Sequence, residues 1–267
     1  MRALQPLRAF ILAAPLTVLG MAGASAAPDL VLDYDIYYGG VSVMKVEARL
    51  DWDEGANPGY AITLEGRTVG LFDTLKPLAF KATAEGVSTG MSFVPSYYAT
   101  STHKRGKQKA LSIHFRPNGA PVARFTPADD AEEPAPPELL QNAIDPGSAV
   151  LTLLNSFARS SACSGKILVY DGKRRYDVAF IDLPREMLQK TSYSIYSGEA
   201  KRCRLDMTPV FGFKPGKRAL LDESTVWFGQ VLDNAPPLPV RIDAKIGLGP
   251  VRLHLASARW VDQQASR

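Results

Sequence analysis

From Leu30 to Trp260 the chain repeats short segments rich in Tyr, Val, Ile and Thr, separated by Gly, Pro, Asn and Asp. In Tyr60–Glu65 the larger apolar residues occupy every second position, the period of a strand with one buried face. Turn pairs such as Gly39-Gly40 and Asp171-Gly172 link neighbouring segments and are typical of hairpins. The pattern therefore predicts a mainly β protein of about a dozen antiparallel strands.

The segments also set the strand boundaries that we expect. They are Leu30–Tyr38, Val41–Trp52, Tyr60–Glu65, Leu78–Val87, Ser96–His103, Lys109–Arg116, Pro121–Thr126, Gly165–Tyr170, Arg174–Leu183, Tyr193–Glu199, Cys203–Thr208, Glu223–Leu232, Val240–Gly247 and Val251–Trp260. One antiparallel sheet of this size should curl, because strand twist accumulates and exposed edges promote aggregation. We expect a half-barrel or β-spiral; two sub-domains are the alternative, divided near an acidic, proline-rich loop at residues 127–138.

One amphipathic helix is predicted at about residues 146–158. Asp145 is placed to act as its N-cap, and Pro146 suits the first helical position, where a missing N–H costs nothing. At helical spacing, one face carries Val150, Leu151, Leu154 and Phe157. We expect this face to pack in or over the concave side of the sheet.

The first 26 residues have the pattern of a cleavable signal peptide. Arg2 and Arg8 form a short positive region, Ala9–Ala22 is apolar, and small residues precede an expected cleavage after Ala26. An uncleaved membrane anchor is the alternative, but it needs about 20 uninterrupted apolar residues. We expect residues 27–267 to form one β-rich periplasmic domain that does not span the membrane.

The two cysteines, Cys163 and Cys203, are expected to form a disulfide, because an exported chain meets oxidising conditions and each thiol has one possible partner. Two unpaired buried thiols are the alternative. In the chain-entropy model a loop of about 41 residues gives on the order of 4 kcal/mol of stabilisation. We expect its role to be structural.

Charge argues against nucleic acid as a partner. Removing residues 1–26 takes away two arginines and no acidic residue, so the net charge falls from +4 to +2. A nearly balanced chain lacks the basic excess that is typical of nucleic-acid-binding domains.

Four segments carry a resemblance to a known family: Tyr34–Val41, Val94–Tyr98, Asp145–Leu154 and Tyr170–Val178. Over most of residues 30–258 the chain resembles an uncharacterised family of exported proteobacterial proteins, known as a domain of unknown function. More distantly, it is similar to disulfide-bearing periplasmic β-spiral proteins linked to envelope integrity, and to half-barrels that carry lipoproteins. The resemblance implies envelope maintenance and implies no catalytic residues.

Motifs that could indicate catalysis or metal binding lack the required context. Gly86–Gly90 fits G-x-S-x-G, but Pro95 and a strand follow where a hydrolase needs a helix, so a hairpin is predicted. Gly212–Lys217 departs from a phosphate loop in both spacing and identity. The histidines lie too far apart for a local metal pattern: His103, His114 and His254. We predict no catalytic residue, no cofactor and no metal site.

Basic residues cluster at several predicted turns and could share one anion-binding rim. They are Lys104, Arg105, Lys107, Lys173, Arg174, Arg175, Lys217 and Arg218. Solvated hairpin tips that discourage strand pairing are the alternative interpretation.

These observations favour a non-enzymatic periplasmic protein that supports the cell envelope by binding a lipid, a lipoprotein or another envelope component. A protein–protein scaffold without a small ligand is the first alternative. An envelope hydrolase with no recognisable motif is the second. A sizeable apolar cavity would favour the binding protein, whereas a filled interior would favour the scaffold.

Overall fold

The computed structural model describes residues 28–52, 58–90, 92–117, 119–128, 133–160, 162–213, 223–246 and 249–262. The predicted signal peptide with its cleavage at Ala26, and the basic residues Lys217 and Arg218, lie outside these ranges. The described strands form one 13-stranded sheet with the order β7-β6-β5-β4-β3-β2-β1-β13-β12-β11-β10-β9-β8. Their bounds are β1 Asp29–Tyr38, β2 Val41–Trp52, β3 Gly59–Thr68, β4 Leu78–Ser88, β5 Phe93–Lys104, β6 Lys107–Arg116, β7 Gly119–Thr126, β8 Ser164–Tyr170, β9 Arg175–Leu188, β10 Gly198–Phe211, β11 Glu223–Gly229, β12 Leu238–Ile246 and β13 Gly249–Val261.

The sheet consists of two meanders joined at one seam. Within β1–β7 and within β8–β13, each strand pairs antiparallel with its neighbours in the chain. The seam is the antiparallel pairing of β1 with β13, from Asp29 opposite Val261 to Tyr38 opposite Val251. The prediction of a mainly β protein with one long antiparallel sheet is confirmed.

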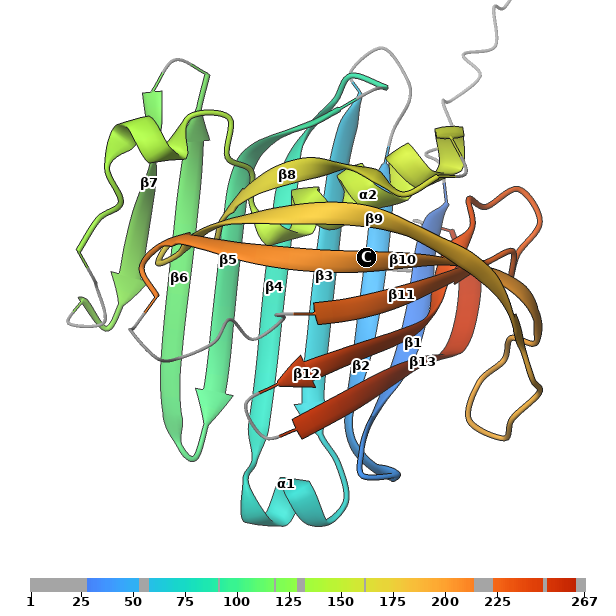
Figure 1. Cartoon of the computed structure of the whole chain (residues 1–267). Helices are drawn as coiled ribbons and strands as arrows, with labels where there is room; N and C mark the ends of the chain where they lie inside the picture. The colour runs from blue at the N-terminus through green and yellow to red at the C-terminus, as the bar shows by residue number, and fades with distance from the viewer. Residues whose placement is uncertain are drawn as a thin grey trace, which may run out of the picture.

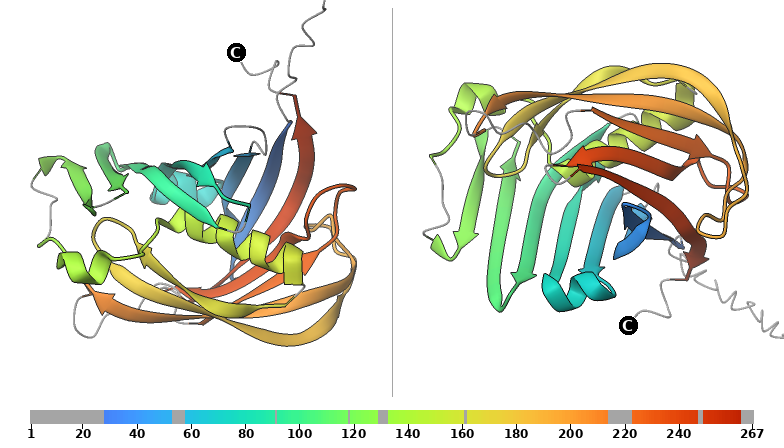
Figure 2. Two further views of the ribbon diagram at one scale, coloured as in Figure 1. Left: turned by 90° about the horizontal axis from the view of Figure 1, so that it is seen from above. Right: turned by 60° about the horizontal axis from the view of Figure 1, so that its bottom comes forward.

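The sheet curls back on itself. In Figure 1 the β1–β7 half runs roughly upright, and the β8–β13 half crosses in front of it. Seen from above in Figure 2, the two halves form opposing layers that meet at β1 and β13, and the helix α2 (Pro146–Ser160) lies between them. The curled sheet and the helix on its concave face were both predicted. Leu151, Leu154 and Phe157 are buried as expected, but the prediction that Val150 shares their buried face is wrong, since Val150 is 42% exposed.

Helix α2 is anchored at its first turn. The Ser148 N–H donates to Oδ1 of Asp145 at 2.9 Å, which is the predicted N-cap bond. Gly147 permits a close approach to the sheet, since a Cβ there would lie 2.6 Å from the Cβ of Ala84 on β4. Further along, the ring of Phe157 stacks on Phe228 of β11 with centroids 4.5 Å apart. The helix is therefore fixed against both layers.

No helix in the described part of the chain is long and apolar enough to cross a membrane.

A short helix, α1 (Leu71–Leu75), joins β3 to β4, and a 3-10 helix, η2 (Pro137–Leu140), precedes α2. Neither was predicted. Ala135, within the expected 127–138 loop, is buried in the main hydrophobic core, so this part of the loop packs against the protein; Leu140, in η2, is buried there too.

The expected strand at Tyr193–Glu199 is wrong. Residues 189–197 are irregular, and β10 begins only at Gly198 and includes the expected Cys203–Thr208 strand. The Tyr196 ring packs where Gly229 leaves no side chain, because a Cβ on that glycine would lie 2.4 Å from Cζ of the ring. This long-range packing overrides the local β propensity of the segment.

Cys163 and Cys203 are joined by the predicted disulfide, with Cα atoms 5.6 Å apart. Both residues are buried. The bond ties the segment that follows α2 to β10, which is otherwise separated from β8 by β9. Its position supports the structural role expected for it.

Candidate functional site

An apolar cavity of about 280 Å³ lies between α2 and the concave face of the sheet. Its apolar lining includes Leu30, Leu50, Phe93, Leu151, Leu154 and Leu238. An apolar cavity of roughly 150 Å³ is enough to take up benzene, so this space can hold a larger apolar group. No charged side chain lines it among the described residues.

One border of the cavity is formed by α2 and the hairpin between β4 and β5. Asn155 Nδ2 and Arg159 Nη1 donate to the Gly90 carbonyl oxygen at 3.4 and 3.3 Å. Ala158, which is exposed, lines the cavity on the same stretch of helix. Ser88 also lines it, at the end of β4 in the hairpin predicted for Gly86–Gly90.

The described residues of the predicted basic rim do not line this cavity. Lys104, Arg105 and Lys107 are exposed at the turn between β5 and β6. Phe93, which lines the cavity, is at the other end of the 12-residue strand β5, roughly 37 Å away along the strand. This turn is therefore separate from the apolar cavity.

The basic residues at the β8–β9 turn contact other parts of the protein. Lys173 Nζ lies 5.0 Å from the ring centroid of Phe125, and the Arg174 guanidinium lies 5.5 Å from that of Phe213. Arg175 is only 4% exposed; its Nε donates to the Leu139 carbonyl at 2.9 Å. The Arg175 guanidinium therefore lies in the interior of the protein. A rim shared by the basic turns stays a prediction.

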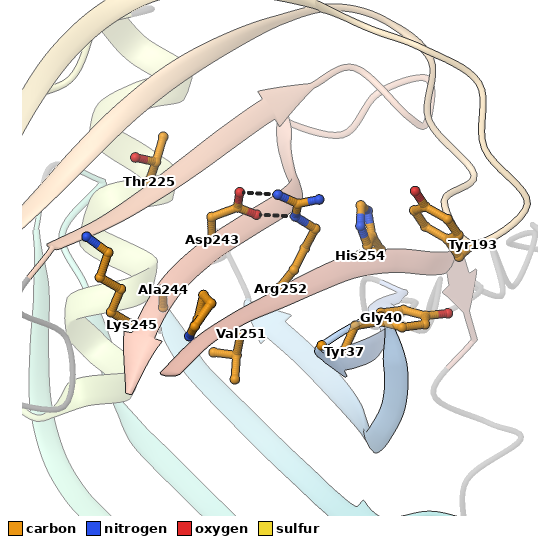
Figure 3. A pocket seen from close by; sticks show the side chains of 12 residues that line it. Tyr37, Gly40, Tyr193, Thr225, Asp243, Ala244, Lys245, Val251, Arg252 and His254 are labelled. Carbon is orange, nitrogen blue, oxygen red and sulfur yellow. Dashed lines mark hydrogen bonds and ion pairs between the residues drawn. The ribbon is translucent and has the colours of Figure 1, made fainter. Parts of the chain in front are cut away.

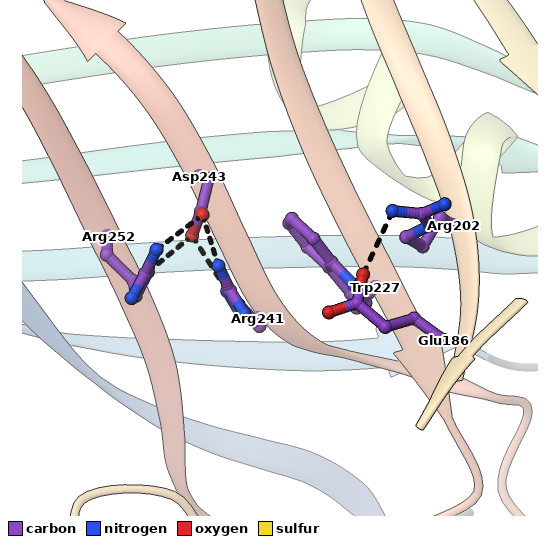
Figure 4. Close-up of polar contacts among 6 residues, drawn as sticks. All are labelled: Glu186, Arg202, Trp227, Arg241, Asp243 and Arg252. Carbon is purple, nitrogen blue, oxygen red and sulfur yellow. Dashed lines mark hydrogen bonds and ion pairs between the residues drawn. The ribbon is translucent and has the colours of Figure 1, made fainter. Parts of the chain in front are cut away.

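A second candidate site lies on the outer face of the sheet, opposite α2, where β12 and β13 form a polar cluster. Asp243 accepts hydrogen bonds from Nε and Nη2 of Arg252, both at 2.8 Å (Figure 3). It also accepts from the same two nitrogens of Arg241 (Figure 4). Burial alone would raise the pKa of Asp243, but the hydrogen bonds from both guanidiniums outweigh it and lower that pKa. One carboxylate thus holds two arginines in fixed orientations.

A tryptophan and a second ion pair extend this cluster across β11 to β9. The Arg241 guanidinium lies 4.2 Å from the Trp227 ring centroid, within the range of a cation–π contact. Trp227 Nε1 donates to Glu186 Oε2 at 3.1 Å, and Arg202 Nη1 donates to the same oxygen at 2.9 Å (Figure 4). These contacts limit the movement of Arg241.

His254 lies beside the arginines on β13 and is only 6% exposed. Its ring packs between two tyrosines, with centroid distances of 4.6 Å to Tyr193 and 5.8 Å to Tyr37. It makes no hydrogen bond to any described residue. Burial, then Arg252 and Arg241, lower the pKa of His254 to about 4, although Asp243 acts in the opposite direction. The imidazole is therefore neutral near pH 7 and is a weak base.

A cleft runs along this cluster. One part, of about 470 Å³, is bordered by β12, β13 and the Gly39-Gly40 turn. A second part, of about 210 Å³, lies beneath residues 186–196. Tyr193, Arg252 and His254 line both parts, so the two form one groove.

The sequence contained a signal for this groove that we did not use. Arg241 and Asp243, like Arg252 and His254, are two residues apart, so each pair lies on one face of a strand. In the β12–β13 hairpin Arg241 lies opposite His254, and Asp243 opposite Arg252. The hairpin register alone would have brought the four residues together. Tyr193 was not predicted to join these residues, because its segment was expected to form a strand at Tyr193–Glu199.

Among the described residues, no group of three or more His, Cys, Asp or Glu side chains could hold a metal ion. Ser194 also lines the groove, but its Oγ accepts from the Tyr196 N–H at 3.3 Å, and no hydrogen bond between described residues joins it to His254. The groove therefore offers hydrogen-bond donors and aromatic rings for binding.

Comparison with known protein families identifies the family of this chain. A family model described as "Protein of unknown function (DUF3108)" matches residues 33–256. The chain belongs to the DUF3108 family. The match includes almost all of the sheet, the helix α2, the lining of the groove and the lining of the apolar cavity except Leu30. A search of curated proteins found no match.

Among solved structures, this DUF3108 chain is similar to one titled "Crystal Structure of Beta-barrel-like Protein of Domain of Unknown Function DUF1849 from Brucella abortus". The alignment covers 89% of this chain and 99% of that one, with 11% sequence identity and a TM-score of 0.53. At this identity the similarity concerns the fold alone.

Proposed function

We propose that this DUF3108 protein is a non-enzymatic binding protein of the cell envelope that takes an apolar segment of a lipid or lipoprotein between α2 and the sheet. The observation that carries the proposal is the apolar cavity of about 280 Å³ on the concave face. A scaffold without a small ligand would need no such space, because protein interiors are normally packed without large voids.

The size and lining of the cavity indicate which part of a ligand would enter. Small-molecule sites usually have volumes of about 300–1,000 Å³ and mostly apolar walls. At about 280 Å³ the cavity is just below that range, so it suits the end of an acyl chain rather than a whole lipid. Burying each methylene there would contribute about 0.8 kcal/mol.

The border of the cavity suits the polar end of such a ligand. Arg159 and Asn155 lie at the mouth, where they bind the Gly90 carbonyl. The Arg159 guanidinium is exposed and could also contact a lipid carboxylate or phosphate. We therefore place the head group at the C-terminal end of α2, and not at the described residues of the predicted basic rim, which do not line the cavity.

We further propose that binding takes place in the periplasm. The signal-peptide pattern at residues 1–26 supports this location, and so does the Cys163–Cys203 disulfide, since such bonds persist in oxidising compartments. The expected mature chain begins at Ala27.

A titration with a dansyl-labelled fatty acid tests the cavity. Ala158→Phe should fill the mouth with a ring and weaken binding of this probe by about 10-fold or more, the effect of losing roughly two buried methylenes. Ala158 is exposed, so the substitution leaves the core intact.

Val150→Phe is the matched control. Val150 is on the same helix and 42% exposed, and it does not line the cavity. It adds the same ring to the surface without blocking the space. Equal affinity in both variants and the unmodified protein would contradict the proposal, as would the absence of saturable binding.

A further inference from the structure

We propose that the groove on the outer face of the sheet is a second binding site, which takes a phosphate group carried on a sugar ring. Its donors are Arg241, Arg252 and His254. The site is separate from the apolar cavity, because residues 252 and 254 point away from the face on which Leu253 and Leu255 join the core.

Arg241 and Arg252 have fixed orientations and N–H groups that could bind an anion. Each guanidinium has five N–H groups, and in the described part of the chain their hydrogen bonds go to Asp243 alone. Further N–H groups of both arginines therefore have no acceptor among those residues. Because Asp243 fixes the orientation of both side chains, an anion would bind with little additional loss of side-chain entropy.

His254 is a third polar side chain that faces the groove. It is a polar side chain, more than nine-tenths buried, that lines both parts of the groove and has no hydrogen-bonding partner among the described residues. The buried side-chain atoms without a partner among the described residues do not include the His254 ring nitrogens, so these nitrogens are open to the groove and available to a ligand. Its neutral form can donate one N–H to a phosphate oxygen.

The charge in the groove suits a phosphate. Arg241 and Arg252 contribute two positive charges beside the negative charge of Asp243 (Figure 4). Glu186, at the far end, is paired with Arg202 and Trp227. The net positive charge of the two arginines and Asp243 favours an anion, and phosphate monoesters are anionic near pH 7.

The aromatic side chains suit a ring next to that phosphate. Tyr193 is 42% exposed, and its centroid is 5.5 Å from that of Tyr37 at the edge of the groove. The larger part of the groove, about 470 Å³, has room for a sugar. A ring that packs on Tyr193 would place its phosphate beside His254 and Arg252.

Histidine-selective NMR on the full mature chain tests the site. The chain has three histidines, and His103 and His114 are exposed on other strands, so they serve as internal references. Glucose 1-phosphate should shift the His254 signals in a saturable way and leave the other two unchanged, whereas glucose should shift none. No shift of His254, or equal shifts of all three signals, would overturn the proposal.

Two arginine variants separate binding from general charge effects. Arg252→Gln should weaken glucose 1-phosphate binding by about 10-fold, because it removes one charged donor. Arg259→Gln is the matched control: the side chains are 46% and 45% exposed, both lie on β13, and each pairs with an aspartate. Equal weakening in both variants would refute a site at His254.

The ligand could be a soluble sugar phosphate or the head group of a lipid-linked one. Phosphatidylcholine vesicles that contain lipid A distinguish the two sources, with pure phosphatidylcholine vesicles as the blank. Co-sedimentation with the lipid A vesicles that is lost in Arg252→Gln indicates a lipid head group. Binding of glucose 1-phosphate without such co-sedimentation indicates a soluble ligand.

Discussion

The N-cap of α2 provides the sharpest test of how the helix is held over the cavity. Asp145 is fully buried; its Oδ1 accepts from the Ser148 N–H at 2.9 Å, and its Oδ2 accepts from the Ser148 hydroxyl. The Ser148 hydroxyl also bonds Tyr60 Oη of β3 at 2.6 Å. Removing the carboxylate therefore affects both the helix start and its contact with the sheet.

Asp145→Ala should lower the free energy of unfolding by about 2 to 4 kcal/mol. Loss of an N-cap costs about 0.5–2 kcal/mol, and leaving buried polar groups without partners costs about 1–3 kcal/mol more. Asp145→Asn should stay within about 1 kcal/mol of the unmodified protein, because the amide oxygen can still accept from Ser148 and asparagine caps helices well. Urea unfolding followed by circular dichroism measures both values.

The pH dependence distinguishes a charged cap from a merely polar one. Burial raises the pKa of Asp145 above its ordinary value of 3.8 despite the hydrogen bonds from Ser148, so the folded protein holds this proton more tightly than the unfolded chain. The stabilisation from this proton is complete below pH 3.8 and is lost as the pH rises through the folded pKa. Asp145→Asn lacks this titration, so its stability relative to the unmodified protein should rise with pH across that window.

A harmless Asp145→Ala, or an Asp145→Asn as damaging as the alanine variant, would refute this reasoning. Ser160→Ala is the control, since its exposed hydroxyl donates to the Ser156 carbonyl at the other end of α2. That change should stay within about 0.5 kcal/mol.

Three further predictions concern the disulfide, the helix contact and the groove. Replacing both Cys163 and Cys203 by serine should lower the free energy of unfolding by about 4 kcal/mol, measured by urea unfolding. Gly147→Ala should cost about 1–3 kcal/mol in the same assay, because its methyl group would overlap the facing strand. Arg252→Gln should raise the pKa of His254 above about 4 in an NMR titration, because a nearby positive charge is lost and Asp243 loses one of its partners.

The controls for these predictions use positions with open surroundings. Gly119→Ala should be nearly neutral, since a Cβ there would lie 3.8 Å from its nearest neighbours, Cβ and Cδ of Arg116, and the φ of Gly119 is not in the left-handed region. Arg259→Gln should leave the His254 titration unchanged, because Arg259 pairs with Asp33 and Glu47 away from the groove. A disulfide-free protein as stable as the unmodified one, or equal costs at the two glycines, would contradict the packing described.

Local signals were sufficient to predict most of the fold. Period-2 alternation and turn residues gave strands such as Val41–Trp52 with both boundaries correct, because these segments pair with their neighbours in the chain. The start of α2 could be predicted from Asp145 and Pro146, because the capping hydrogen bond joins residues only three positions apart. The sheet seam is different: β1 and β13 are more than 200 residues apart, so no local pattern determines their pairing.

The sites were harder to predict because they depend on contacts distant in sequence. Tyr193 has a strand-like neighbourhood, yet the fit of Tyr196 against Gly229 holds its segment in an irregular conformation beside His254. The apolar cavity arises from a space that the helix and two layers leave unfilled, and no single residue signals it. The basic turns were visible in the sequence, but their separation from the cavity depends on the length of β5.

The central claim is that the concave cavity holds part of an envelope lipid. Lipid extraction and mass spectrometry of the protein purified from periplasm test it most directly, with Ala158→Phe and Val150→Phe purified in parallel. We predict a lipid that co-purifies with the unmodified protein and with Val150→Phe, and is depleted in Ala158→Phe. No lipid above the level of an unrelated periplasmic protein, or equal amounts in all three samples, would contradict the claim.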